Sequence, residues 1–379
     1  MVSSGADTPS PTSESELKVL LVTGSFPPLV CGVGDYCGRL STALACQSGI
    51  ELSVLTSRAA GHQRIGGVKV LAEIDTWHLR EARQVLATIR REAPDIVHVQ
   101  YPTQNYVGRL PNAIPMLAKL AGTAVVQTWH EPLRLRDLVQ KKLAASTVIV
   151  VRENFADLLT RESRFVLGGT VLHYIPGAAA LPVAALDLAT RNALRDRYLR
   201  GQQRLVVFFG FIYPHKGVEQ VFDIADPASD HIVVAGKFAC DDEYRARLLK
   251  LADGKWKGKV TFTGFLEASD AAELLAVADA VLLPFRDGGG AWNSSLSGAI
   301  LNGAYVVTTS KHKRGYDAAQ NVAYSDADDI DGMRSALALS EERRACLGMG
   351  NADDWEQVAA RHVDVYREAL ARSKTLKRE

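Results

Sequence analysis

The sequence has 379 residues, of which 47% are hydrophobic and 23% are charged, so it describes a globular protein that is too long for a single hydrophobic core. Its formal net charge of +1 at pH 7 argues against a general nucleic-acid binder. The five cysteines lack CxxC or zinc-ligand spacing, which favours reduced buried thiols in a cytoplasmic protein and argues against a metal centre.

Residues 1–16 are rich in Ser, Thr, Pro and Glu, which predicts a disordered tail rather than a signal peptide. No run of 18 apolar residues appears, so no membrane span is expected. From Leu17 onward, short Val/Ile/Leu runs without period-two alternation alternate with amphipathic helical stretches. We therefore predict parallel sheets in two doubly wound α/β domains, at 17–185 and 186–352, followed by a helix and tail at 353–379.

The predicted elements follow one another as strand and helix in both domains. The first domain is expected to have strands at 17–23, 51–56, 68–72, 95–99, 123–128 and 147–151, and helices near 35–48, 78–92, 110–121, 133–144 and 153–161. A Pro/Gly-containing stretch at 174–182 and a charged helical stretch at 188–200 place the boundary near 180–190. The second domain is expected to have strands at 204–210, 231–236, 259–263, 280–284 and 305–309, helices at 217–226, 241–253, 270–278, 293–302 and 328–338, and a long amphipathic helix at 356–372.

In the first loop, Gly32 and Gly34 precede a helix, where glycines let backbone amides approach a phosphate or sugar. A plain tight turn explains them equally well. The GxGxxG spacing of dinucleotide-binding proteins is missing, which argues against an NAD enzyme.

Polar residues lie at the carboxyl ends of two predicted strands of the first domain. In such a fold, the carboxyl ends of parallel strands face the cleft. Gln100, Tyr101, His130 and Glu131 are therefore predicted to contact a ligand. His98 lies inside its strand and is predicted to be a satisfied core histidine. A His-Glu pair is also a common structural contact, so both interpretations of His130 remain open.

The apolar strand at 205–209 runs into a glycine turn at Gly210 that presents Lys216 immediately before Gly217. This arrangement suits phosphate binding, because a point charge stands at the start of a helix. Taken alone, such a motif is more often a solvated lysine in a loop.

A second glycine loop, at 285–292, precedes the helix that starts at Asn293, a natural N-cap. The amides and hydroxyls of Ser294 and Ser295 would then point out of the positive helix end toward a diphosphate. Turn formation alone would also explain the glycines, but this loop and Lys216 converge on one phosphate site.

Acidic pairs and basic helices elsewhere have simpler interpretations. Asp241-Asp242 and the acidic residues at 326 and 328 are predicted to be a helix start and a solvated loop, since neither has metal-ligand spacing. The basic sets are Arg80, Arg83, Arg90 and Arg91, and Arg134, Arg136, Lys141 and Lys142. Solvated helix faces are the default for them, with an acidic lipid surface or anionic acceptor as the minority alternative.

Together these segments resemble the GT-B fold glycosyltransferases, specifically the retaining family 4, over nearly the whole chain. The resemblance rests on residues 26–36, 128–130, 210–217, 260–264 and 278–284, and on 302–308. It implies two Rossmann-like domains facing a cleft, with the C-terminal helix crossing back to the first domain.

The resemblance also implies roles for single residues. His130 would contact the donor sugar and Lys216 the diphosphate, as the two catalytic residues. The donor phosphates and sugar would be bound by Gly32, Val33, Gly34, Asp287, Gly290, Asn293, Ser294 and Ser295. The nucleotide would be bound by Gly210, Phe211, Gly236, Phe265 and Leu266. Gln100, Tyr101 and Glu131 would lie on the acceptor side.

Two departures from the family concern charged side chains. The family usually has an arginine on the turn before its lysine, where this chain has Phe211. Its paired glutamates would fall near Gly290 and Gly298, so Arg286 and Asp287 are candidates to replace them.

The implied activity is metal-independent, retaining transfer of a hexose from a nucleotide-diphosphate sugar to a saccharide or lipid-linked saccharide acceptor. This assigns the chain to glycan or glycoconjugate biosynthesis in the cytoplasm, with no cofactor and no nucleic-acid partner. Peripheral membrane contact through the first domain is the minority alternative. Two other functions remain open: a sugar-nucleotide epimerase or phosphorylase on the same fold, and a non-catalytic partner subunit.

Overall fold

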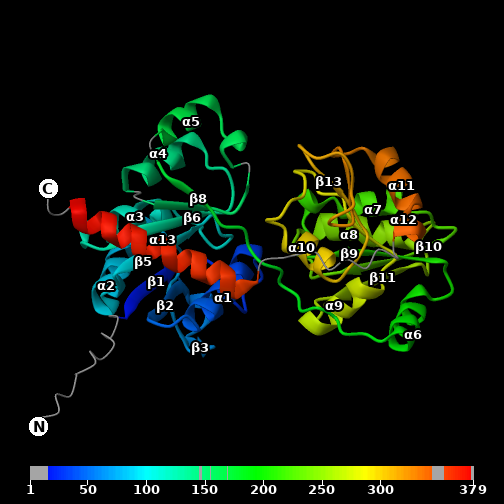
Figure 1. Ribbon diagram of the computed structural model, residues 1–379, viewed down its shortest axis with the longest axis horizontal. Helices are drawn as coiled ribbons and strands as arrows, with labels where there is room; N and C mark the ends of the chain where they lie inside the picture. The colour runs from blue at the N-terminus through cyan, green and yellow to red at the C-terminus, as the bar shows by residue number, and fades with distance from the viewer. Residues whose placement is uncertain (1–15, 145–146, 154, 169, 344–353, 377–379) are drawn as a thin grey trace, which may run out of the picture.

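The computed structural model describes residues 16–144, 147–153, 155–168, 170–343 and 354–376, which form two α/β units, each built on one β-sheet (Figure 1). Apart from Glu16, the predicted tail lies outside the described residues. None of the helices in this part of the chain is both long enough and apolar enough to cross a bilayer.

The first sheet has eight strands in the order β3-β4-β2-β1-β5-β6-β7-β8. They are β1 (Leu17–Val22), β2 (Ile50–Ser57), β3 (Gln63–Ile65), β4 (Val68–Ile74), β5 (Ile96–Tyr101), β6 (Ala124–Trp129), β7 (Thr147–Val150) and β8 (Leu172–Tyr174). The helices of this unit are α1 (Gly32–Ala45), α2 (Ala82–Glu92), α3 (Leu110–Leu120), α4 (Leu135–Ala144) and α5 (Arg161–Leu167). All six predicted strands are present, and β1, β5, β6 and β7 end at one edge of the sheet because they run parallel.

The second sheet has seven strands in the order β11-β10-β9-β12-β13-β15-β14. They are β9 (Arg204–Phe209), β10 (Asp230–Ala235), β11 (Val260–Gly264), β12 (Ala280–Leu283), β13 (Val306–Thr309), β14 (Gly315–Asp317) and β15 (Val322–Ser325). Its helices are α6 (Leu188–Leu199), α7 (Val218–Ile224), α8 (Asp242–Asp253), α9 (Ala268–Val277), α10 (Ser294–Leu301), α11 (Ile330–Ala338) and α12 (Ser340–Arg343). The Asp241 carboxylate accepts the Tyr244 amide at 2.8 Å, which confirms that this acidic pair begins a helix.

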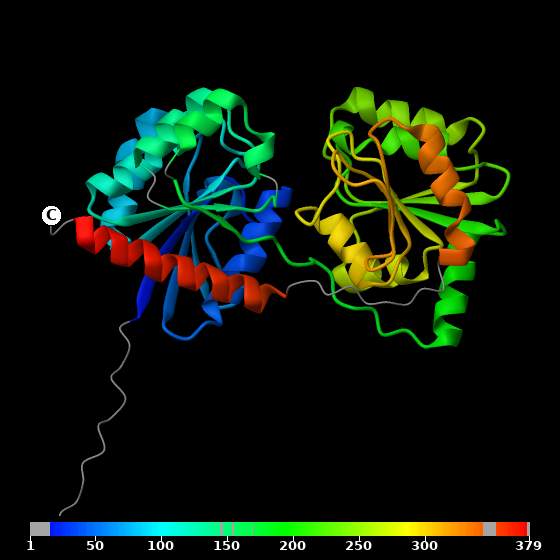
Figure 2. The same ribbon diagram turned by 45° about the horizontal axis from the view of Figure 1, so that its top comes forward.

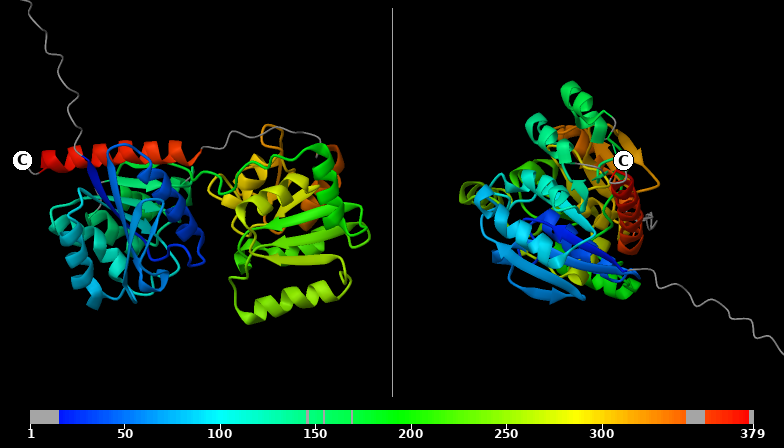
Figure 3. Two further views of the ribbon diagram at one scale, coloured as in Figure 1. Left: turned by 90° about the horizontal axis from the view of Figure 1, so that it is seen from below. Right: turned by 90° about the vertical axis from the view of Figure 1, so that its left-hand side faces the viewer.

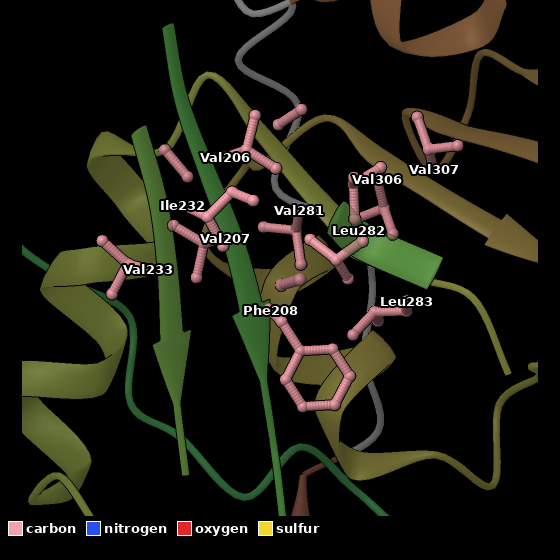
Figure 4. Packing of buried hydrophobic residues seen from close by; sticks show 14 of the residues in the cluster. Val206, Val207, Phe208, Ile232, Val233, Val281, Leu282, Leu283, Val306 and Val307 are labelled. Carbon is pink, nitrogen blue, oxygen red and sulfur yellow. The ribbon is translucent and has the colours of Figure 1, made fainter. Parts of the chain in front are cut away.

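The strands of the second sheet are continuous apolar runs because helices cover both faces of the sheet. Val206, Val207 and Phe208 of β9 are fully buried and pack beside residues of β10 and β12 in one cluster (Figure 4). β9 and β12 end at the same edge of this core, and the loops that follow them lie on the side of the first unit.

Helix α13 (Trp355–Leu376) crosses back and lies along the first unit (Figures 1 and 2). Figure 3 shows the same placement from two further sides. Val358, Val363 and Tyr366 of α13 are buried in the same cluster as residues of β1 and α1. The predicted crossing is thus confirmed, and the end of the chain supplies part of the first core.

The expectation of wholly parallel sheets is wrong at two edges. β3 pairs antiparallel with β4, and β14 pairs antiparallel with β15. Gly66 and Gly67 join β3 to β4, and their positive φ values of 55° and 85° suit a two-residue hairpin turn. A three-residue strand is too short to show a hydrophobic period, so the sequence gives no sign of these edges.

The predicted helix at 153–161 is also wrong. The described residues there form a 3₁₀ turn at Phe155–Leu158, and a new helix, α5, begins after Thr160. The Thr160 hydroxyl accepts the Ser163 amide at 3.2 Å, so this side chain caps the start of α5. The sequence analysis predicts the end of a helix at this point instead.

The prediction of buried thiols holds in part. Cys31 and Cys37 are buried, Cys46 is exposed and Cys240 is half-buried, and all four are free thiols. Cys346 lies outside the described residues.

Candidate active site

Two glycines shape the strand ends beneath the candidate phosphate site. A Cβ at Gly236 would lie 1.9 Å from the carbonyl oxygen of Gly210, and one at Gly217 would lie 2.2 Å from that of Pro284. Gly217 also has φ +65°, in the left-handed region that favours glycine. The turns after β9, β10 and β12 therefore touch backbone to backbone.

Lys216 ends a 3₁₀ turn, Pro214–Lys216, and is followed by Gly217, the residue that precedes α7. Its side chain turns toward the neighbouring glycine loop, with Nζ 4.2 Å from the ring centroid of Phe285. Burial lowers the pKa of Lys216 to about 8, Glu131 opposes this shift, and Arg152 adds to it. Lys216 is thus a half-buried cation rather than a fully solvated loop lysine.

Asn293 occupies the N-cap position of α10, but its side chain does not cap the helix. Its Oδ1 accepts the Gly290 amide at 2.9 Å instead. The amides of the first turn of α10 are left without that cap, and Ser294 is exposed beside them. The prediction of a side-chain N-cap at Asn293 is therefore wrong.

The glycine loop itself uses its amides internally. Gly288 donates to the Phe285 carbonyl at 3.1 Å, Gly289 to that of Thr309 at 2.7 Å, and Gly290 to Asn293. The three glycine amides therefore hold the shape of the loop, and the amide of Gly290, which was predicted to bind the donor phosphates or sugar, is already used by Asn293. A Cβ at Gly290 would lie 2.0 Å from the indole ring of Trp292, so this ring requires glycine there.

Helix α1 also begins without a side-chain cap, since Cys31 makes no capping hydrogen bond. Gly32 is exposed with open space around its Cβ position, Val33 is half-buried, and Gly34 packs on Ser25. The first turns of α1 and α10 lie on the sides of the two units that face each other (Figures 1 and 2).

His130 follows β6 and is buried, with 8% of its surface exposed. Its Nε2 lies 2.8 Å from Oε1 of Gln100, and the Gln100 Nε2 lies 3.0 Å from Nε2 of His98. Nδ1 of His98 in turn lies 2.7 Å from the Tyr366 hydroxyl of α13. The prediction of a satisfied core histidine is confirmed for His98.

The same contacts correct the role predicted for Gln100. It is fully buried with both ends of its amide engaged, so it positions His130 and has no surface to offer an acceptor. Because an amide oxygen only accepts, Nε2 of His130 carries the proton and donates to it. Burial lowers the pKa of His130 to about 3, with His362 and Arg152 adding to the shift, so the ring is neutral near pH 7.

Tyr36 of α1 packs edge-on against the His130 ring, with centroids 4.8 Å apart, and also against Trp355 at 5.3 Å. Its hydroxyl lies 3.4 Å from Nε2 of His362 on α13. The rings and hydrogen bonds around His130 and His98 thus include Tyr36, His362 and Tyr366. Sequence reasoning missed His362 and Tyr366, because α13 is far from the site along the chain.

Arg152 lies across the cleft from the second unit. Its guanidinium forms an ion pair with Glu131 (Nη2 to Oε2, 2.5 Å) and stacks 4.7 Å from the ring centroid of Trp292. The sequence analysis does not name Arg152 as a site residue. It follows β7, so the rule that polar residues after parallel strands lie at the site, which identified His130, applies to it as well.

The remaining predicted residues lie at the rim. Tyr101 is half-buried and stacks on Tyr106, while Asp287 is exposed. Five residues follow strands β9, β10 and β11. Gly210, Phe211, Gly236 and Leu266 are half-buried, whereas Phe265 is 65% exposed. Ser295 is buried with its Oγ 2.5 Å from the Cβ position of Gly210.

Arg286 is not free to replace a glutamate. It pairs with Glu219 and, at 3.2 Å, with Asp328. Glu219 also accepts from the Tyr244 hydroxyl, so Arg286 belongs to a structural network on the far side of the loop. Of the two candidates suggested by the sequence, only Asp287 is available.

A known domain family and several solved structures are similar to this chain. Residues 31–176 match the family described as glycosyl transferase 4-like domain. No curated protein sequence matches the chain.

Three solved structures are similar to it in fold. A sucrose-phosphate synthase from Thermosynechococcus elongatus superposes with a TM-score of 0.71 at 15% identity, covering 94% of this chain and 99% of that one. HepE from Anabaena, solved with UDP and glucose, gives 0.64 at 14% identity, covering 96% and 100%. A putative UDP-N-acetylglucosamine 2-epimerase from Listeria monocytogenes gives 0.59 at 13% identity, covering 92% and 95%. The chain therefore has the two-domain fold of the GT-B glycosyltransferases, with a glycosyl transferase 4-like domain in its N-terminal half.

Proposed function

We propose that this protein transfers a sugar from a nucleotide-diphosphate sugar to an acceptor hydroxyl. The observation that carries the proposal is the half-buried Lys216, whose Nζ turns toward the loop that leads into the uncapped end of α10. A cation and free helix amides at one strand edge favour a diphosphate. The glycosyl transferase 4-like match and the UDP and glucose bound to HepE support the same donor class.

The donor would lie along the cleft with its diphosphate between Lys216 and the first turn of α10. The base would lie on the β9–β11 side, near Phe211 and Phe265. The sugar would extend toward His130, whose neutral ring keeps an acceptor lone pair on Nδ1 because Nε2–H is held by Gln100. His130 would then accept a hydrogen bond from a sugar hydroxyl.

In the proposed reaction, the bond between the anomeric carbon and the diphosphate oxygen breaks, and its electron pair stays on the diphosphate. The acceptor oxygen bonds to the anomeric carbon, and its proton passes to the departing phosphate. Lys216 and the α10 amides stabilise the charge that builds on the leaving group, so the reaction we propose requires no metal ion.

Retention of configuration is part of the proposal. Neither Gly290 nor Gly298 leaves room for a carboxylate: a Cβ at Gly298 would lie 3.1 Å from Leu181, and the Trp292 ring fills the space at Gly290. A carboxylate nucleophile from these positions would have to displace those side chains. Attack by the acceptor on the face that the phosphate leaves gives retention without one.

The acceptor is expected to approach from the first unit, where Tyr101 and Glu131 line the rim. A saccharide or lipid-linked saccharide would fit the proposed place in glycan or glycoconjugate biosynthesis. The exposed basic residues Arg134 and Arg136 near the start of α4 are the feature that would support contact with an acidic membrane surface.

The test is thermal stabilisation of the purified protein by a panel of nucleotide-diphosphate sugars, with Lys216→Ala beside it. We expect one nucleotide series to raise the Tm of the native protein, with a smaller rise in the variant. With the donor identified, Lys216→Ala should lose about 2–4 kcal/mol of transition-state stabilisation, measured as kcat/KM. If no nucleotide sugar raises the Tm, a non-catalytic partner subunit becomes the better interpretation.

A second candidate is a sugar-nucleotide epimerase, favoured by the likeness to the Listeria fold. The products separate the two activities, as they also separate a phosphorylase. A transferase yields a glycoside of the acceptor, whereas an epimerase changes the sugar without any acceptor.

A further inference from the structure

Arg152 forms a bridge between the two units. The register of β6 and β7 pairs Trp129 with Val150, so Glu131 and Arg152 leave adjacent strands at the same level. Their ion pair holds the guanidinium over the Trp292 ring of the second unit, 4.7 Å from its centroid. An arginine stacked on an indole is fixed in one plane with its remaining N–H groups directed outward.

The two contacts of Arg152 belong to the two halves of the candidate site. Glu131 directly follows His130, and Trp292 directly precedes Asn293 and the open end of α10. The guanidinium therefore lies between the residue expected to meet the sugar and the amides expected to meet the phosphates.

The hydrogen bonding of Arg152 is incomplete. The residue is 9% exposed, and its Nε is buried without a hydrogen-bond partner. Among the described residues its one ion pair is with Glu131, whose side chain is 51% exposed. A buried arginine with an unused donor and a solvent-exposed partner can exchange that partner for a stronger anion.

The surroundings favour an anion as the ligand. Arg152 lines a small pocket between the units with Trp292, Ser310, Lys311 and His312, and Asp287 is the one carboxylate among the lining residues. Lys216 is close enough for the charge of Arg152 to lower its pKa, after the larger effect of burial. The turn that carries Lys216 has Phe211 at its start, so this turn contains one lysine and no arginine.

We propose that Arg152 is the second cation of the diphosphate site, contributed by the first unit across the cleft. This assignment rests on the proposed function. In the donor complex the guanidinium leaves Glu131 and binds a phosphate oxygen opposite Lys216. The leaving group is then held by one cation from each unit, so donor binding draws the two units together.

The test compares a nucleoside diphosphate with the matching monophosphate by titration calorimetry, using the nucleotide series that stabilises the native protein. Arg152→Ala should weaken diphosphate binding about 10–100-fold and change monophosphate binding less than about threefold. Arg152→Lys should fall between the native protein and Arg152→Ala. Arg343→Ala is the matched control, because Arg343 stacks 4.1 Å from the Tyr316 ring on the edge strand β14 and should leave both affinities unchanged.

Glu131→Gln separates a phosphate contact from a structural ion pair. It breaks the same pair but leaves the guanidinium in place, so diphosphate binding should be retained or become tighter. Equal weakening of both nucleotides by Arg152→Ala, or the same loss in Glu131→Gln, would overturn the assignment. If the native protein binds no nucleotide at all, the proposed function fails and this assignment fails with it.

Discussion

Oε1 of Gln100 accepts the Nε2–H of His130 at 2.8 Å, from a side chain that is itself fully buried. The hydrogen bond fixes the tautomer of His130 and the plane of its ring before any ligand arrives. Pre-organisation of this kind lowers the cost of binding a sugar hydroxyl in one orientation.

Gln100→Leu should therefore damage both stability and activity. It leaves His98 and His130 buried with one partner fewer, so the free energy of unfolding should fall by about 1–3 kcal/mol. We expect kcat/KM to fall about tenfold or more, because His130 can turn. Urea unfolding and steady-state kinetics measure the two effects. Gln84→Leu is the control, since its amide is bonded at 3.0 Å on the exposed face of α2; equal effects of the two variants would contradict a positioning role.

The charge of Lys216 should set an upper pH limit for donor binding. Because burial lowers its pKa to about 8, the free protein loses this cation as the pH rises through 8. The Kd for the donor diphosphate should then rise toward tenfold per pH unit, measured by calorimetry between pH 7 and 9.5. Lys216→Arg keeps its charge over this range and should flatten the profile. An unchanged profile in that variant would show that another group titrates.

Gly217 should tolerate no side chain. Gly217→Ala combines a left-handed φ of +65° with a Cβ 2.2 Å from the Pro284 oxygen, so we expect a loss of about 1–3 kcal/mol and displacement of Lys216. Gly258→Ala is a matched control with φ +77° and open space around its Cβ. It should lose stability through backbone strain alone and keep its diphosphate affinity. The expectation fails if both variants bind the diphosphate equally well.

Acid should destabilise the first unit through its buried histidines. Burial lowers the pKa of His130 to about 3, of His362 to about 4, and of His98 well below 6.5. Each histidine binds fewer protons folded than unfolded, so its contribution to stability is complete above pH 6.5 and is lost as the pH falls toward the folded pKa.

The slope should approach about 1.4 kcal/mol per pH unit for each histidine, measured by urea unfolding at pH 7, 6 and 5. His362→Leu should reduce the slope by about 1.4 kcal/mol per pH unit, whatever its effect at pH 7. A slope that does not change in this variant would assign the acid sensitivity to other groups.

The fold was predictable where hydrophobic runs are long, and the site only where it follows such runs. His130 comes directly after the buried strand β6, and Lys216 lies in the turn that follows the buried strand β9, so their place at the sheet edge follows from strand direction. Gln100 obeys the same rule but turns inward, since its neighbours His98 and His130 satisfy both ends of its amide. That pairing depends on register between β5 and β6, which composition does not reveal.

Contacts between segments that are distant along the chain could not be predicted from the sequence. Asn293 has the residue type and position of an N-cap, yet its oxygen is taken by Gly290, so the helix end stays open. Arg152 depends on Trp292, a residue 140 positions later that lies close only after both units have folded. Propensity rules describe neighbours along the chain and do not reach such pairs.

The passage of α13 back to the first unit has a consequence for biosynthesis. Tyr366 fills the core beside α1 and holds His98, but it is translated after nearly all of the chain. The first unit emerges from the ribosome lacking part of its interior, and an interrupted chain would expose Val358 and Val363 or the surface that receives them. The hydrogen-bond network of His98 is therefore complete only after α13 has been made, so products truncated before α13 would lack it.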